Sequence, residues 1–229
     1  MTKAFLYAAW LHSGGRHDTV DAHVRAVRDW PRAGATAAYT LLPRTPVMQS
    51  ISDRLAHTGV ELYPHLPDVV VLTDVDTLDA ALDLDAHLQA TPVVVRGIYR
   101  EVVTVAGTAP SPASGFAPAI QLGTFSMRSA ADEWAVTQWY RTRRLPSFSA
   151  ISGSIRARRF VSACGGPAKL AVLYEFTSLD DRARHFEPLE LSDHDETRPT
   201  AATRTVHAPM SPSIGAALDV APPNAPRVG

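Results

Sequence analysis

Apolar residues recur every three to four positions in the segment 131–145, and this period predicts an amphipathic helix. Trp139 and Tyr140 lie on its apolar stripe. Ser129, followed three residues later by an acidic side chain, forms a capping-box pattern that predicts where the helix begins. Pro146 is expected to end the helix.

Short apolar runs bounded by glycine, proline or polar residues predict β-strands along the rest of the chain. The expected strands are 3–10, 36–42, 69–75, 93–103, 154–163, 170–176 and 203–207, and the other expected helices are 18–30, 78–88 and one that begins after 178. The tail from Pro209, rich in proline and alanine, is expected to wrap a surface.

The two halves of the chain carry the same pattern. The segment VVVLTDVDTLD, which begins at Val69, aligns without a gap with LAVLYEFTSLD, which begins at Leu170, so that Asp74 falls on Glu175. Each half then reads as βαββαβ, the ferredoxin-like unit whose helices cover one face of a four-stranded antiparallel sheet. Because both faces of these strands are largely apolar, two such units can bury their free faces against each other.

The expected division of the chain follows from this duplication. Residues 1–106 form an N-terminal ferredoxin-like repeat with an insertion at 44–67. Residues 107–117, rich in proline and glycine, form a linker, and residues 118–229 form a C-terminal repeat that ends in a proline-rich tail.

Composition narrows the function classes. A formal net charge of −1 argues against a nucleic-acid partner or an anionic membrane surface, which usually require a basic face. No apolar run approaches the roughly 20 residues that span a bilayer, and the N-terminus alternates like a strand, so a cytoplasmic protein is expected.

Cys164 is the single cysteine, which excludes an internal disulfide, and no histidines have metal-ligand spacing, so no metal is expected.

Known catalytic motifs are absent from the sequence. It contains no phosphate-binding loop, no dinucleotide-binding glycine pattern, no hydrolase nucleophile elbow and no zinc-protease helix motif. The function must therefore be sought in the spatial arrangement of side chains rather than in a short sequence signature.

One stretch of the second half carries a family resemblance. The helix reads WYRTRRLP from Trp139 to Pro146, the next strand reads RARRF up to Phe160, and the following strand reads LAVLYEF. Over roughly 118–208 the chain resembles the EthD-like branch of the dimeric α+β barrel superfamily. The resemblance implies an α+β fold in which tandem ferredoxin-like repeats form a pseudo-dimeric α+β barrel. Activities in that superfamily include cofactor-free lyases, isomerases, cyclases and oxygenases and, in other branches, haem enzymes, so the fold alone does not select a reaction.

The chain departs from that pattern at one place. An acidic residue and a histidine of the EthD-like helix fall on Arg143 and Arg144, so a catalytic base would have to come from elsewhere. The two arginines could bind a carboxylate, enolate or phenolate through forked hydrogen bonds. Alternatively, they are exposed basic residues at the C-terminal end of a helix.

Two acidic residues lie at equivalent places in the middle of strands. Asp74 or Glu175 could act as a general base with a raised pKa. The alternative is that both are structural ion pairs. Their candidate partners are Arg96, Arg158, Arg159 and Arg204, of which Arg158 and Arg159 are the leading ones.

The leading hypothesis is a cofactor-independent enzyme of the lyase, isomerase or cyclase type. It would transfer protons in a small apolar carbonyl or phenolic metabolite, without a cofactor or metal. A cofactor-free oxygenase and a non-enzymatic binding or assembly protein remain alternatives, and a homodimer is left open. The expected catalytic residues are His12, His17, His65 and Tyr63, and the expected substrate-binding residues are Tyr7, Tyr99, Tyr140, Arg144 and Trp139.

Overall fold

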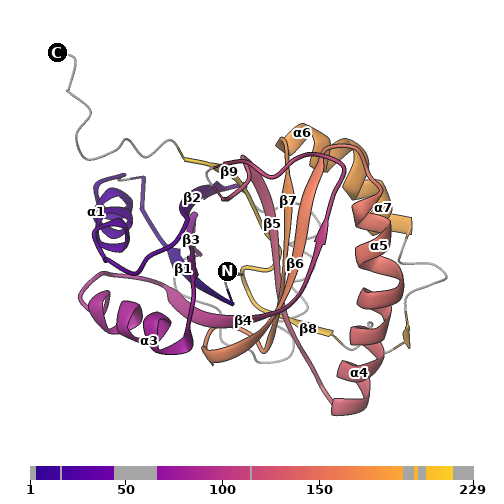
Figure 1. The fold of residues 1–229 in the computed structure, drawn as a ribbon, viewed down its shortest axis with the longest axis horizontal. Helices are drawn as coiled ribbons and strands as arrows, with labels where there is room; N and C mark the ends of the chain where they lie inside the picture. Colours follow the sequence, from indigo (N-terminus) through magenta and orange to yellow (C-terminus); the bar gives the residue numbers. More distant parts are fainter. Residues whose placement is uncertain are drawn as a thin grey trace.

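The structure is a computed structural model that describes residues 4–15, 17–43, 66–113, 115–192, 199–200 and 205–218. Figure 1 shows strands in the middle of the molecule, with helices α1 and α3 on one side and helices α4 to α7 on the opposite side. In the part that is described, no helix is long and apolar enough to cross a bilayer.

Both halves contribute helices and strands in a similar order. The first half contains β1 (Phe5–Leu11), α1 (His17–Arg28), β2 (Thr36–Leu41), β3 (Val69–Val75), α3 (Leu78–His87) and β4 (Val95–Ala106). The second half contains β5 (Ala119–Met127), α4 (Ala130–Trp139), η1 (Tyr140–Arg144), α5 (Leu145–Ser149), β6 (Ser154–Gly165), β7 (Leu170–Phe176), α6 (Leu179–Asp181), η2 (Arg182–Phe186), α7 (Glu187–Ser192), β8 (Thr205–His207) and β9 (Ser213–Ala217). The elements η1 and η2 are π-helical turns.

The strands form a closed antiparallel barrel. Neighbouring strands follow the order β7-β6-β4-β1-β3-β2-β9-β5, and β5 pairs again with β7, which closes the ring. β8 lies outside the ring, on β5 beside β9. The ladders β4–β6 and β2–β9 join the two halves. The predicted fold class, tandem ferredoxin-like repeats in a pseudo-dimeric α+β barrel, is confirmed.

Side-chain alternation along the strands divides the core into three layers. On β1, Leu6 and Trp10 point into the barrel, where they pack with residues of both halves. Tyr7 and Leu11 point outward, into the layer beneath α1 and α3. A third cluster, which includes Phe148, lies between the sheet of the second half and its helices. Two layers outside the barrel are therefore available for a binding site, one in each half.

The same cap begins a helix after β3 and after β7. The Thr77 hydroxyl accepts a hydrogen bond from the Ala80 backbone N–H at 3.1 Å, and the Ser178 hydroxyl accepts one from the Asp181 N–H at 3.0 Å. Thr77 and Ser178 are equivalent residues in the duplicated sequence. The duplication therefore extends from the sequence to the local geometry of these two helix starts.

Pro146 does not end the helix, contrary to the prediction. The helical segment continues from α4 through the π turn η1 into α5, and Pro146 lies in the first turn of α5. A proline at that position is tolerated, because its missing N–H is not needed for the first bonds of a new α-helical turn.

The tail after Pro209 is also more ordered than the sequence suggests. β9 inserts between β2 and β5, where it pairs with Thr40 and Ile120, among others. The tail was predicted to wrap a surface, but its strand completes the barrel. The sequence SIGAA is short and contains glycine, so it lacks a β-branched run such as the one in β3.

Gly215 on β9 should be intolerant of a side chain. A Cβ atom there would lie 2.6 Å from the Thr40 carbonyl oxygen, which is backbone and cannot move without disturbing β2. We expect Gly215→Ala to lower the free energy of unfolding by about 1–3 kcal/mol in urea titrations. Gly123→Ala on β5 is the matched control, because its Cβ would meet the side-chain Cγ1 atom of Val172 at 3.3 Å and the Val172 carbonyl oxygen at 4.0 Å, an ordinary contact distance. Equal losses in the two variants would contradict a closely packed β2–β9 seam.

Candidate functional site

The helix–sheet layers of the two halves differ in polarity. Beneath α1 and α3 the cluster is largely apolar, with valine, alanine and leucine side chains in contact. The corresponding layer of the second half buries Arg159 of β6 and two arginines of its helical segments, Arg144 and Arg182, which are 5% and 7% exposed. A buried guanidinium requires a partner of opposite charge or a set of acceptors. The helix–sheet layer of the second half is therefore the better candidate for a functional site.

Both buried arginines of the helical segments belong to π-helical turns. Arg144 ends η1 and Arg182 begins η2. A π turn adds one residue to a helical turn, which changes the direction of the side chains that follow, and such turns occur frequently at functional sites. Arg144 is consequently buried, whereas Arg143 beside it is exposed. The alternative that both arginines are exposed at a helix C-terminus is excluded for Arg144.

Arg144 is bound on several sides. Its Nε donates to the Tyr174 hydroxyl at 3.2 Å, and its Nη2 donates to Oε1 of Glu190 at 3.3 Å. Its guanidinium carbon lies 4.7 Å from the centre of the Phe186 ring. Burial alone would lower the pKa of Arg144, but Tyr174 and Glu190 outweigh it and raise the pKa, so the side chain stays a cation.

Glu190 links the two arginines. Its Oε1 accepts from the Gln121 Nε2 at 2.8 Å, and its Oε2 lies 3.6 Å from the Arg182 Nη2. Gln121 in turn accepts from the Arg182 Nε at 2.7 Å. The Glu190 side chain is 30% exposed, whereas both arginine side chains are below 10%. The partly exposed carboxylate of Glu190 therefore lies against side-chain N–H donors from β5, η1 and η2.

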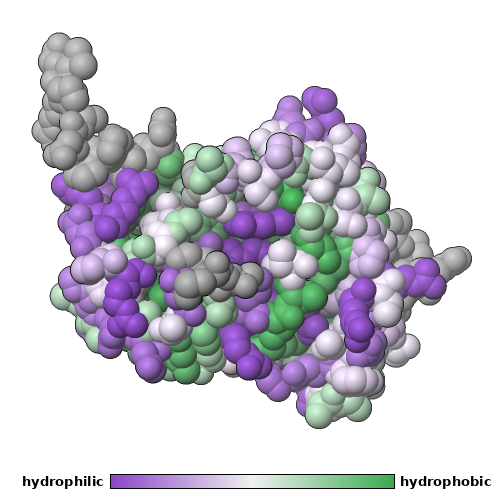
Figure 2. All heavy atoms as spheres, viewed as in Figure 1, coloured by the Kyte–Doolittle hydropathy of each residue, from purple (hydrophilic) through white to green (hydrophobic). Residues whose placement is uncertain are grey.

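Aromatic rings adjoin this cluster. The ring centres of Trp139 and Tyr140 are 5.0 Å apart in an edge-to-face contact, and Phe125 stacks on Tyr140 at 6.0 Å. The guanidinium carbon of Arg159 lies 5.3 Å from the centre of the Tyr140 ring. Figure 2 shows hydrophobic atoms reaching the surface in a band beside helices α4 and α5.

Two N–H donors of this aromatic group are fully buried and lack an acceptor. They are Nε1 of Trp139 and Nε of Arg159, and within the described part of the chain no acceptor lies within hydrogen-bonding distance of either. The Arg159 Nη2 does donate to the Thr137 hydroxyl, at 2.7 Å. Burial lowers the pKa of Arg159. Buried donors without a partner are uncommon and call for an explanation.

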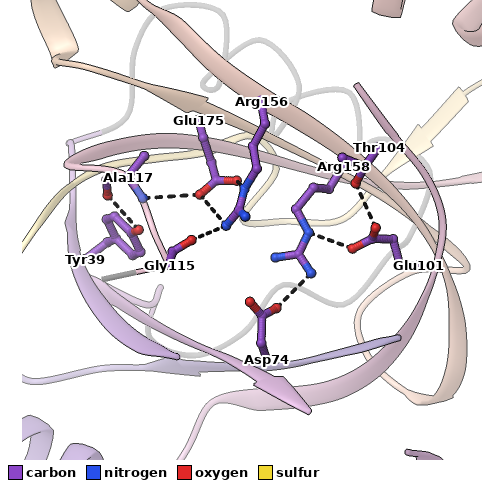
Figure 3. Close-up of polar contacts among 9 residues, drawn as sticks. All are labelled: Tyr39, Asp74, Glu101, Thr104, Gly115, Ala117, Arg156, Arg158 and Glu175. Carbon is purple, nitrogen blue, oxygen red and sulfur yellow. Dashed lines mark hydrogen bonds and ion pairs between the residues drawn. The ribbon is translucent and has the colours of Figure 1, made fainter. Parts of the chain in front are cut away.

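A second polar cluster fills the interior of the barrel (Figure 3). Arg158 on β6 donates through Nη2 to Oδ1 of Asp74 on β3, and through Nε to Oε2 of Glu101 on β4, both at 2.7 Å. Asp74 belongs to the first half and Arg158 to the second. The ion pair therefore ties the halves together across the barrel.

The equivalent acid of the second half is also paired inside the barrel. Glu175 is fully buried and accepts from Arg156, and the Ala117 N–H donates to its Oε1 at 3.2 Å. Arg156 also donates to the Gly115 carbonyl oxygen, and the Tyr39 hydroxyl donates to the Ala117 carbonyl oxygen at 2.8 Å (Figure 3). The chain segment between β4 and β5 is thus bound into the barrel.

Some of the predicted ion-pair partners are replaced. Arg156, which the sequence did not single out, binds Glu175. Arg159 faces the helices, and Arg96 pairs with Asp85 at 2.9 Å. The reason lies in the strand alternation of β6, which turns Arg156 and Arg158 into the barrel and Arg159 to the outer face. Arg204 lies outside the described residues.

Of the predicted acid–base set, the structure describes the side chain of His12 alone. His12 is exposed, and its Nδ1 lies 3.0 Å from the Leu66 carbonyl oxygen. His17 is the first residue of α1. His65 and Tyr63 lie outside the described residues.

The predicted substrate-binding residues fall into three places. Tyr7 points into the layer beneath α1 and α3, whereas Tyr99 points into the barrel, so the sheet separates them. Trp139, Tyr140 and Arg144 do lie together, in the helix–sheet layer of the second half. Within the described residues, this layer is the strongest candidate site.

Three residues of that layer were missed by the sequence analysis: Gln121, Arg182 and Glu190. The sequence does contain a signal for Arg182. When the alignment of the two halves is extended by two residues, Arg182 falls on Ala81, which is fully buried in the first half. An arginine at the equivalent of a buried alanine predicts a buried charge.

Comparisons with known proteins identify the fold but no family. No family model matches the chain, and no curated protein matches it. Solved structures do match, including chlorite dismutase from Candidatus Nitrospira defluvii in complex with imidazole, at 13% identity and a TM-score of 0.54 over 96% of this chain and 93% of that one. A heme-binding protein from Thermus thermophilus matches at 11% identity and a TM-score of 0.55, over 96% and 93%. An anthrone oxidase-like protein matches at 10% identity and a TM-score of 0.54, over 95% and 92%.

These neighbours overturn the leading functional hypothesis. Proteins that share almost the whole fold are described as a chlorite dismutase, a heme-binding protein and an anthrone oxidase-like protein. The prediction of a cofactor-independent enzyme for cyclisation, isomerisation or elimination is therefore wrong. At these identities the similarity shows the fold alone, so a function has to be argued from the residues of this chain.

Replacing Asp74 with asparagine should change how stability depends on pH. Burial raises the pKa of Asp74 in the folded chain more than Arg158 lowers it, so the folded chain keeps this proton to a higher pH than the unfolded chain does. The stability that the carboxyl contributes is therefore complete below its ordinary pKa and is lost as the pH rises through the folded-state pKa. In urea titrations from about pH 4 to pH 7, the free energy of unfolding of the wild type should fall relative to that of D74N.

The control for this experiment is Asp180→Asn, because the Asp180 side chain is 81% exposed. D180N should parallel the wild type over the whole pH range. If D74N also parallels the wild type, burial does not hold the proton on Asp74.

Proposed function

We propose that the chain binds a planar hydroxy-aromatic molecule in its anionic form, in the helix–sheet layer of the second half, and promotes its oxidation by molecular oxygen. The observation that carries the proposal is the pair of fully buried N–H donors without an acceptor, Trp139 Nε1 and Arg159 Nε, beside the Tyr140 ring.

The two unpaired N–H donors favour a ligand that presents an oxygen atom as a hydrogen-bond acceptor. Leaving a buried donor unsatisfied costs about 1–3 kcal/mol, and more for a charged group, so an oxygen acceptor that meets both would stabilise the site. Arg159 makes an ionised oxygen the better acceptor, because a charge-assisted hydrogen bond is roughly twice as strong as a neutral one. The rings of Trp139, Tyr140 and Phe125 offer surfaces against which a planar ring can stack.

Stabilising the anion of a hydroxy-aromatic molecule also prepares it for oxidation, because removal of the proton makes the ring easier to oxidise. Arg159 and Trp139 would hold the charge on that oxygen, as preorganised donors do. For an anthrone, the ring methylene loses two hydrogens and gains one oxygen atom of O2 as a carbonyl, and the other oxygen atom leaves as water. The anthrone oxidase-like neighbour supports this class of reaction.

Haem, which one neighbour is described as binding, is less well matched to these residues. Haem iron requires an axial ligand such as histidine, cysteine, methionine or tyrosine. The EthD-like helix position of histidine holds Arg144, whose protonated guanidinium cannot ligate iron. Among the described residues of α4 to α7, His185 is the one histidine, and it is exposed. The helix position of the histidine therefore supplies no axial ligand, and the proposed function does not use haem.

Anthrone oxidation tests the proposed function. We expect the wild type to consume one O2 for each anthraquinone formed, as measured with an oxygen electrode and by absorbance. Trp139→Phe keeps the aromatic surface but removes the N–H, and it should slow the reaction by roughly three- to tenfold. Trp134→Phe is the control, because Trp134 is 67% exposed and should not matter. Equal rates in W139F and the wild type would remove the Trp139 donor from the site.

A haem titration tests the alternative cofactor. Adding hemin to the purified protein should give no saturable Soret band, because Arg144 stands where the EthD-like helix has a histidine. His207, on β8 with its ring centre 6.1 Å from that of Phe125, is the imidazole to check. A stoichiometric Soret band that disappears in His207→Ala would establish haem binding and displace the proposed function.

A further inference from the structure

We infer that Arg144 and Arg182 form a carboxylate-binding subsite, that the Glu190 carboxylate holds this subsite in the structure, and that the ligand carries a carboxylate which displaces Glu190. The inference rests on the proposed function and adds to it the chemical class of the ligand, a hydroxy-aromatic acid.

The donors of the subsite are more deeply buried than the carboxylate that they bind. The side chains of Arg144 and Arg182 are 6% and 8% exposed, and that of Glu190 is 30% exposed. Glu190 can therefore turn outward into solvent, whereas the two guanidinium groups remain in place. An incoming carboxylate would meet the same donors.

The contacts between the arginines and Glu190 are long. They measure 3.3 Å for Arg144 and 3.6 Å for Arg182, whereas a charge-assisted N–H···O bond is typically about 2.7–2.9 Å. The ion pair between Arg158 and Asp74 inside the barrel is shorter and more deeply buried. Its N–O distance is 2.7 Å, and neither side chain is more than 6% exposed. Asp74 is fixed as a structural partner, whereas the arginines hold Glu190 loosely, and the Gln121 amide that donates to its Oε1 at 2.8 Å could donate to an incoming carboxylate instead.

The fold does not need arginine at this place. Arg182 aligns with Ala81 in the duplicated sequence, and the layer of the first half packs an alanine there without a charge. A buried guanidinium costs desolvation energy that alanine does not. The presence of Arg182 is therefore better explained by the binding of an anion than by packing.

The subsite adjoins the place proposed for the ionised ring oxygen. The guanidinium carbon of Arg144 lies 5.9 Å from the centre of the Trp139 ring, and Trp139 also contacts Tyr140. A ligand that stacks against these rings can direct one oxygen toward Trp139 and Arg159 and a carboxylate toward Arg144. Exchange with Glu190 conserves charge within the layer, since one carboxylate leaves and one enters.

Calorimetric titrations with two matched probes test the inference. The probes are 1-naphthol and 1-hydroxy-2-naphthoate, which differ by the carboxylate. Glu190→Gln removes the competing charge but keeps the size of the side chain and a hydrogen-bonding group for Gln121. We expect E190Q to bind 1-hydroxy-2-naphthoate about tenfold more tightly than the wild type does, and to bind 1-naphthol with unchanged affinity.

Glu187→Gln is the matched control. It changes the net charge by the same amount, but Glu187 lies 3.5 Å from Arg182 and its side chain is 46% exposed, against 30% for Glu190. E187Q should bind both probes nearly as the wild type does. Arg182→Met should abolish the preference of E190Q for the acid, and circular dichroism melts would verify that each variant is folded.

The outcomes separate the two proposals. If 1-naphthol binds and E190Q has no tighter binding of the acid, the carboxylate subsite is refuted and the proposed function stands. If the acid binds more tightly to E190Q but Trp139→Phe leaves its affinity unchanged, the subsite stands and the proposed binding of the hydroxyl oxygen fails. If neither probe binds, both are overturned. Should E190Q not fold, Glu190→Asp must also tighten binding of the acid, because its shorter side chain reaches the arginines less well.

Discussion

The ion pair between Arg158 and Asp74 is the constraint on which the barrel depends. Each half supplies one partner, and both side chains are almost completely buried. Breaking such a pair by removing one partner typically costs about 3–5 kcal/mol, because an uncompensated charge stays behind. The halves therefore cannot separate without exposing or orphaning charge. Glu175 and Arg156 add a second pair, which also fixes the chain segment that connects the halves.

Because structural charges and large apolar side chains occupy the barrel interior, a ligand site is better sought outside it. The outer layer of the first half is filled mostly by valine, alanine and leucine side chains. The outer layer of the second half contains the buried arginines, the partly exposed Glu190 and the unpaired donors of Trp139 and Arg159. The two halves thus have similar backbones but different side chains in these layers, and the buried arginines distinguish the layer in which we propose that the ligand binds.

Much of this architecture could be read from the sequence. The strands Val69–Val75 and Leu170–Phe176 match their predicted limits, because strongly β-forming residues are followed, one residue later, by a capping residue. β9 could not be predicted, since its five residues are stabilised by neighbours on both sides rather than by their own propensity. The site was sought mainly among histidines of the first half, because histidine is the usual acid–base residue. Side-chain direction, which separates Tyr7 from Tyr99, depends on register and became visible only in three dimensions.

The two π turns place the buried arginines of the second half's helical segments. Ala81 and Leu84, which are buried on α3, are the equivalents of Arg182 and His185 in the duplicated sequence. The turn η2 keeps Arg182 buried but leaves His185 exposed, and it turns Phe186 against the Arg144 guanidinium. The sequence alignment alone would bury the histidine, because it matches a buried leucine. The π turns thus put charged side chains into a layer that the first half fills mainly with apolar ones.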